Sequence, residues 1–193
     1  MKRYVLFLLM SGLVLAASLT SCGYDEYAEA NYPETMVYQP MAFEPIWSID
    51  APNPENPSPE TPGGPKKYDI DKAGNKFIVY MGVAQSGIER KSFTVNVAAD
   101  PSVVSAMIAD GTLPADTEAL PASAFSLPVT VELSASTASA PFRMEIDLSA
   151  LTDANAGKKL AVAVTISSPS VKVNEDMDTA VIYIDTAFIQ ALL

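Results

Sequence analysis

Side chains that commonly do chemistry are scarce in this sequence. It contains no histidine, which removes the commonest general base and metal ligand, and its one cysteine is Cys22. Hydrolysis of a glycosidic bond would need two carboxyl groups at a defined separation, one of them with a raised pKa. The acidic residues fall in expected turns, in the N-terminal segment or on the polar side of expected strands, and no pair stands out. With no glycine-rich phosphate loop and no nucleophile elbow, the sequence predicts a protein that is not an enzyme and needs no cofactor.

Two acidic stretches are candidates for calcium binding. Residues 69–74 (Asp-Ile-Asp-Lys-Ala-Gly) match half of a calcium loop, but Ala73 and Tyr80 occupy positions where that loop requires oxygen ligands. Asn174-Glu175-Asp176 with Asp178 is a denser cluster just before the last expected strand. A solvated turn is favoured over calcium there, so we predict no metal site.

Trp47 is the only tryptophan and lies with Phe43 and Ile46 in a segment flanked by prolines. Sugars have C–H faces that stack on exposed aromatic rings. Trp47 together with Tyr38 or Tyr68 could therefore form a glycan-binding platform. The alternative is a tryptophan that fills one end of a β-sandwich core, and the exposure of its ring decides between the two.

The elements that would position these residues are mostly strands. Apolar and polar side chains alternate, or β-forming residues cluster, in seven segments, which places one face of each strand on a core. The segments are residues 36–43, 77–83, 93–97, 129–133, 142–148, 160–166 and 180–185. The sequence predicts one helix, over residues 100–111. Asp100 is a good N-cap, Pro101 suits the first helical position and Gly111 suits the C-terminal end of the helix.

This pattern predicts an all-β fold, an immunoglobulin-like β-sandwich of about seven strands with one short helix, over residues 32–185. Residues 51–65 contain six prolines, which favour an extended backbone. We interpret them as a long loop between the first two strands, with a linker ahead of a smaller domain as the alternative. The apolar tail, residues 186–193, could cover a sheet edge, form a short docked helix or contact a partner protein.

The N-terminal residues predict where the protein works. Lys2 and Arg3 precede an apolar run, Val5 to Ala17, which is typical of an export signal and is interrupted too often for a spanning helix. Leu19-Thr20-Ser21-Cys22 resembles the lipobox of bacterial lipoproteins, in which a peptidase cuts before a diacylglycerol-modified cysteine. The resemblance implies a signal peptide over residues 1–21, lipidation of Cys22 and a membrane anchor through its acyl chains. An ordinary cleavage site is the alternative.

We expect residues 22–31 to form an acidic tether. Gly23 follows Cys22, so the aspartate that retains lipoproteins in the inner membrane is absent, and Asp25 and Glu26 resemble the acidic export tag of Bacteroidetes surface lipoproteins. That resemblance implies an outer-membrane protein that faces the cell exterior. The formal net charge of −11 repels phosphate backbones, so nucleic acid is excluded as a partner.

Several short motifs resemble, in their order along the chain, the Bacteroidetes lipoprotein domain of unknown function 1735. They lie at residues 32–33, 37–40, 83–87, 100–103, 111–112, 120–127 and in the last strand before Asp185. The family is often found ahead of glycoside hydrolase or lectin-like domains in surface glycan-utilisation proteins, and we expect the domain to stand alone here. A separate resemblance concerns O-glycosylation: Asp178-Thr179-Ala180 and Asp185-Thr186-Ala187 are similar to the short acceptor pattern of exported Bacteroidetes proteins. A role in strand formation is the alternative for Thr179 and Thr186.

These features predict a non-catalytic surface lipoprotein that assists a polysaccharide-utilisation system, with a polysaccharide ligand or outer-membrane glycan-uptake proteins as partners. The alternative is a structural or adhesion module, a pilus anchor or envelope assembly subunit, that would use the apolar tail.

Overall fold

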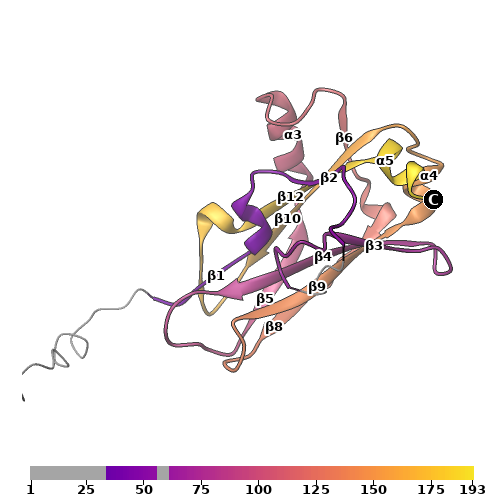
Figure 1. Ribbon diagram of the computed structural model, residues 1–193. Helices are drawn as coiled ribbons and strands as arrows, with labels where there is room; N and C mark the ends of the chain where they lie inside the picture. Colours follow the sequence, from indigo (N-terminus) through magenta and orange to yellow (C-terminus); the bar gives the residue numbers. More distant parts are fainter. Residues whose placement is uncertain (1–33, 56–60) are drawn as a thin grey trace, which may run out of the picture. The chain divides into compact units, whose positions relative to one another are not determined.

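Alternating apolar residues build two β-sheets that pack face to face (Figure 1). The computed structural model describes residues 34–55 and 61–193. The expected signal peptide, the lipidation site Cys22 and the tether over residues 22–31 lie outside the described residues. The all-β sandwich predicted from the alternation is confirmed.

The first sheet has the strand order β11-β1-β4-β9-β7, and β3 pairs with β4. Its strands are β1 (Met36–Tyr38), β3 (Tyr68–Asp71), β4 (Lys76–Gln85), β7 (Phe125–Ser126), β9 (Ser139–Asp147) and β11 (Lys172–Val173). The long pair of β4 and β9 is its centre, with Tyr80 directly opposite Arg143.

The second sheet has the order β2-β12-β10-β5-β8, and β6 pairs with β10. Its strands are β2 (Trp47–Ile49), β5 (Phe93–Ala99), β6 (Thr117–Ala119), β8 (Thr130–Leu133), β10 (Lys159–Ser167) and β12 (Thr179–Asp185). The inward side chains of both sheets form one core, which includes Phe77, Met144, Leu160 and Ile182, all fully buried.

The predicted helix is α3 (Pro101–Ala109), and it covers part of the outer face of the second sheet. The Asp100 carboxylate accepts a hydrogen bond from the Ser102 amide at 2.9 Å, as expected of an N-cap. Val104 packs with Leu113 on Ala161 and Ala163 of β10 in a small second cluster. Gly111 ends this segment with φ +81°, a conformation that favours glycine.

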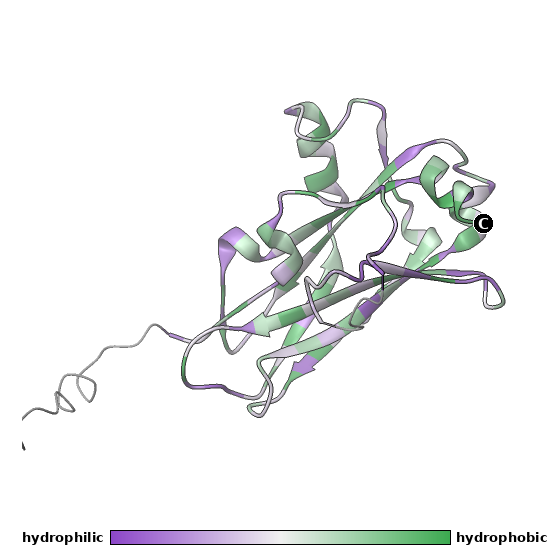
Figure 2. Ribbon diagram, in the orientation of Figure 1, coloured by the Kyte–Doolittle hydropathy of each residue, from purple (hydrophilic) through white to green (hydrophobic). Residues whose placement is uncertain are grey.

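Two shorter helices, α4 (Leu148–Thr152) and α5 (Thr186–Ala191), lie together near the C terminus (Figures 1 and 2). Asp185 caps α5 by accepting from the Ala187 amide at 2.9 Å, and Ile189 is fully buried in the main core. Phe188 and Leu192 pack against the same core. The apolar tail is therefore a docked helix, and its apolar residues are largely turned to the protein's own interior.

The structure differs from the sequence prediction in three respects. The described residues form twelve strands and not about seven, because the five that were not expected, β2, β3, β6, β7 and β11, have only two to four residues each. The first strand ends at Tyr38, and Pro40 begins the 3-10 helix η1 (Pro40–Phe43). Leu148 begins α4 and does not extend β9. Two further 3-10 turns are η2 (Ala122–Ala124) and η3 (Glu175–Met177).

The described part of the proline-rich stretch lies between β2 and β3. Pro62 packs against Gly82 on the outer face of the first sheet, where a Cβ at position 82 would meet the Pro62 ring and lie 2.8 Å from the Ala140 carbonyl oxygen. Within the two described ranges, no helix is long and apolar enough to cross a membrane.

Candidate functional site

The aromatic platform expected from the sequence does not form. Trp47 and Tyr68 are only 6% and 5% exposed, so neither presents a ring face to a sugar. Tyr68 stacks on Phe77 at a centroid distance of 5.2 Å and meets the edge of Phe188. Both rings belong to the core because each lies on the inward side of its strand. Trp47 therefore fills the core of the β-sandwich, which was the alternative to an exposed sugar-binding ring.

Tyr38 lies apart from the other two. It is opposite Ala84 on β4, whereas Tyr68 is opposite Val79 on the same strand. Because side chains alternate along a strand and these two positions are five residues apart, Tyr38 and Tyr68 lie on opposite faces of the sheet. The glycan-binding prediction for Trp47, Tyr38 and Tyr68 as one surface is therefore wrong.

The two threonines predicted as glycosylation acceptors differ. Thr186 is fully buried, and its hydroxyl donates to the carbonyl oxygens of Asn155 and Lys158, each at 2.8 Å. It is not accessible in the folded protein, and the prediction is wrong there because the residue begins a docked helix. Thr179 is half-buried, with its hydroxyl 2.8 Å from Asp178, and remains a predicted acceptor.

The acidic stretches have structural roles. The side chain of Asn174 caps η3 by accepting from the Asp176 amide at 3.2 Å. Asp71 closes the turn between β3 and β4 by accepting from the Gly74 amide at 2.9 Å. Among the residues that the structure describes, no three carboxylates are grouped closely enough to hold a metal ion.

The structure instead brings polar groups together around Tyr80 on the outer face of the first sheet. Tyr80 points outward because its neighbours Val79 and Met81 point into the core. Lys66 Nζ lies 5.0 Å from the centre of the Tyr80 ring on the β3 side, and Arg143 Cζ lies 5.5 Å from it on the β9 side. We call Lys66, Asp69, Tyr80, Arg143 and Glu145 the Tyr80 row.

Asp69 links this row together. One of its oxygens, Oδ2, accepts from Lys66 Nζ at 2.7 Å and from the Tyr80 hydroxyl at 3.1 Å. The hydrogen bond from Lys66 lowers the pKa of Asp69 and raises the pKa of Lys66, so both groups stay charged at neutral pH. Glu145 follows two residues after Arg143 on the same face of β9.

The row alternates hydrogen-bond donors and acceptors across three strands. Lysine and arginine only donate, the two carboxylates accept, and the tyrosine hydroxyl does both. A recess of about 230 Å³ lies beside it, lined by Tyr80, Pro141, Phe142 and Arg143. Equal numbers of positive and negative groups around a ring suit an uncharged ligand rich in hydroxyl groups, such as a neutral sugar.

The sequence gives only half of this row. Tyr80 and Arg143 fall on the polar side of expected strands, but they meet only because of the register between β4 and β9. Residues 63 apart in the chain carry no local signal of that pairing. Asp69 lies in β3 and Lys66 just before it, and β3 is not among the strands expected from the sequence.

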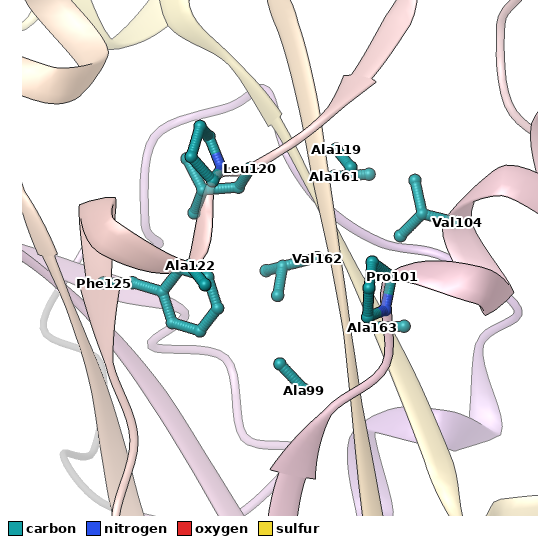
Figure 3. A pocket seen from close by; sticks show the side chains of 11 residues that line it. Ala99, Pro101, Val104, Ala119, Leu120, Ala122, Phe125, Ala161, Val162 and Ala163 are labelled. Atoms are coloured by element: carbon teal, nitrogen blue, oxygen red, sulfur yellow. The ribbon is translucent and has the colours of Figure 1, made fainter.

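A second recess, of about 260 Å³, is lined only by apolar side chains (Figure 3). It opens where β5 leaves β10 at Ala99 and β6 joins β10 at Ala119. Figure 3 shows Pro101 and Val104 of α3 on one side, Leu120 and Phe125 on the other, and Val162 of β10 between them. It suits an apolar group and offers no side-chain partner to a sugar hydroxyl.

Comparison with known proteins gives one family match. A family model described as "-like, N-terminal domain" matches residues 59–173, more than half of the chain. No curated protein matches.

Solved structures of similar fold come from Bacteroides. An auxiliary nutrient binding protein from Bacteroides thetaiotaomicron is 16% identical with a TM-score of 0.49, and the match covers 74% of this chain and 44% of that one. A proposed carbohydrate binding protein from Bacteroides ovatus is 16% identical with a TM-score of 0.47, covering 78% and 36%. A multidomain protein from Bacteroides ovatus that includes domain of unknown function 1735 is 14% identical with a TM-score of 0.45, covering 56% and 36%. The chain thus spans less than half the length of these proteins.

Proposed function

The chain belongs to the N-terminal-domain family that its sequence resembles, domain of unknown function 1735, and from that premise we propose that it is a non-catalytic module that binds polysaccharide at the cell surface. The observation that carries the proposal is the Tyr80 row. It places an aromatic ring, two cations and two carboxylates on one outer sheet face, with a recess beside them.

Binding rather than cleavage is supported by the charge state of Asp69. A general acid in glycoside hydrolysis needs a raised pKa so that it holds a proton at neutral pH. The pKa of Asp69 is lowered by its hydrogen bond to Lys66. The carboxylate is therefore suited to accept hydrogen bonds from hydroxyl groups and unsuited to donate a proton to a leaving group.

The proposal also states where in the cell the protein acts. The lipobox ending at Cys22 and the acidic residues Asp25 and Glu26 support an outer-membrane lipoprotein that faces the cell exterior, beside glycan-uptake proteins. Labelled palmitate should be incorporated into the wild-type protein and not into Cys22→Ala. A Cys22→Ala form that is processed normally and still fractionates with the envelope would contradict this part of the proposal.

Affinity electrophoresis tests the binding function. The chain from residue 23 is run through gels that contain neutral polysaccharides of different backbones, and at least one should retard it. Arg143→Ala should weaken the retarding interaction about tenfold or more, because hydrogen bonds to charged groups contribute roughly 1.5–3 kcal/mol. Tyr80→Ala should weaken it as well.

Phe43→Ala is the matched control, because Phe43 is 83% exposed and lies outside the Tyr80 row. It should leave the retardation unchanged. If no neutral polysaccharide retards the wild-type protein, or if the Phe43 and Tyr80 variants behave alike, the proposed function is wrong.

A further inference from the structure

A third recess, of about 250 Å³, lies between β2 and the proline-rich segment. Half of its lining residues are polar, namely Ser48, Asp50, Asn53 and Lys67. Most of the others are pyrrolidine rings, Pro52, Pro54 and Pro65. The recess is smaller than the roughly 300–1,000 Å³ of sites that enclose a drug-sized ligand, so it has room for a single small ring.

The wall formed by the proline-rich segment is held in place by Asn53. Its side-chain amide donates to the Tyr68 carbonyl oxygen at 2.8 Å, and its oxygen accepts from the Lys67 amide at 2.8 Å. These two bonds fasten the segment to the start of β3. The prolines add fixed backbone angles, so the recess exists before any ligand binds.

Lys67 connects the recess to the tryptophan below it. Its ammonium donates to the Ser48 carbonyl oxygen at 2.9 Å and lies 4.4 Å from the centre of the Trp47 ring. An ammonium group has three donors, so two remain for a ligand in the recess. The indole nitrogen of Trp47 is buried and has no hydrogen-bond partner among the described residues, so its N–H donor is unsatisfied.

Lys66 and Lys67 serve different surfaces. Successive side chains of an extended segment point in opposite directions. Lys66 accordingly joins the Tyr80 row on the first sheet, whereas Lys67 reaches the carbonyl oxygen of Ser48 in the second sheet. A ligand in the recess would therefore contact groups that the Tyr80 row does not use.

We propose that this recess is a second carbohydrate subsite that holds one neutral sugar ring. Lys67 donates to a sugar hydroxyl, Asp50 accepts from another, and the proline rings pack on the C–H face. The mixed lining suits the mixed surface of a sugar, and the presence of one carboxylate, Asp50, and one ammonium group, Lys67, in the same small recess suits an uncharged ligand. The inference rests on the proposed function, because it assigns a second contact to the same class of ligand.

Trp47 is the chain's only tryptophan, so its fluorescence reports on this corner alone. The chain from residue 23 is titrated with cellobiose, mannobiose and galactobiose into the millimolar range. At least one disaccharide should shift the Trp47 emission in a saturable manner, because it changes the position of Lys67 above the ring. Tyr80→Ala should retain this shift.

Two variants test the assignment. Lys67→Gln and Asp50→Ala should each lower the association constant measured by fluorescence about tenfold or more, as expected for the loss of one hydrogen bond to a charged group. Glu55→Ala removes an exposed carboxylate from the same segment but outside the lining and should change nothing. Asp50 is exposed, so its variant tests the site even if Lys67→Gln alters the fold.

The outcomes separate this inference from the function on which it rests. If neutral polysaccharide retards the protein in gels but no disaccharide changes the Trp47 emission at millimolar concentration, the proposed subsite is wrong, and the proposed binding at the Tyr80 row is unaffected. Wild-type affinity in both recess variants would do the same. If neither gels nor fluorescence detect a sugar, both proposals are wrong.

Discussion

Gln39 joins the two sheets through its amide group. It is fully buried, and its side-chain nitrogen donates to the carbonyl oxygens of Val164 and Asp178, both at 2.7 Å. Its backbone amide also donates to the Met177 carbonyl oxygen at 2.9 Å. One side chain thus ties the end of β1 to the hairpin between β10 and β12.

We expect Gln39→Leu to be strongly destabilising. Leucine has a similar size but donates neither hydrogen bond, so the Val164 carbonyl oxygen loses this donor and the Asp178 carbonyl oxygen keeps only the Ile166 amide. Each lost hydrogen bond contributes about 0.5–1.5 kcal/mol, so the free energy of unfolding should fall by roughly 2 kcal/mol, measured by urea denaturation with Trp47 fluorescence. Gln190→Leu is the control, because its exposed amide donates one bond, to the Thr152 carbonyl oxygen. Equal losses in the two variants would contradict the role given to Gln39.

The lowered pKa of Asp69 predicts that the stability of the fold depends on pH. Its pKa is lowered from 3.8, mainly by the hydrogen bond from Lys66, so folding favours the charged form. The stabilisation is complete above the ordinary pKa and is lost as the pH falls below 3.8 through the lowered value. Because the pair is exposed, its contribution is at most about 1 kcal/mol.

Asp69→Asn should therefore be slightly less stable than the wild type at pH 7, and the difference should disappear under acidic conditions. Thermal unfolding between neutral and strongly acidic pH measures this, with Glu44→Gln at an exposed carboxylate as the control. A difference that grows as the pH falls has the wrong sign and would refute the assignment.

At the level of elements, α5 stabilises the sandwich by docking on its core. Ile189 is fully buried, and Phe188 and Leu192 pack beside it. Truncating a buried isoleucine to alanine removes apolar contacts and leaves a cavity, which costs about 2–5 kcal/mol. Ile189→Ala should lower the free energy of unfolding by that amount, measured by urea denaturation.

Leu193→Ala, at a residue that is 46% exposed, serves as the matched control and should have little effect. If Ile189→Ala folds normally but loses a binding partner, the tail acts in assembly, as expected of a pilus anchor or an envelope assembly subunit. A loss of stability alone supports α5 as a structural cover.

Most strands that could be predicted from the sequence are long enough to show a period, although β1 has only three residues and β3, with four, is not among the expected segments. The strands β4, β5, β8, β9, β10 and β12 each contain four residues or more, and alternation or a run of β-forming residues revealed them. The strand β2, with three residues, and β7 and β11, with two each, are too short to show any period. Their positions follow from pairing with distant strands, which local sequence does not encode.

The same limit applies to the candidate sites. Trp47 was conspicuous as the only tryptophan, but rarity does not determine exposure, and its position on an inward side of β2 depends on a pairing with β12. Tyr80 and Arg143 were inconspicuous because each lies singly on the polar side of a strand. Only the register of β4 and β9 makes them neighbours.

Across the whole molecule, charge restricts the ligand. The chain carries a formal net charge of −11, whereas the Tyr80 row is balanced, with two cations and two carboxylates. A neutral polysaccharide meets no long-range repulsion, but a polyanion is repelled over about 10 Å at 0.1 M salt and further at lower salt. The proposed binding should therefore be selective for uncharged chains.

This selectivity can be measured with the same polysaccharide in a neutral and a negatively charged form. Whichever neutral polysaccharide retards the protein in gels should retard it much less after carboxymethylation, and the loss should shrink as salt rises because the repulsion is screened. Retardation by the neutral form should change little with salt, which controls for effects of salt on the protein. If the carboxymethylated chain binds more tightly at low salt, the cations of the row dominate recognition, and the ligand is an acidic polysaccharide.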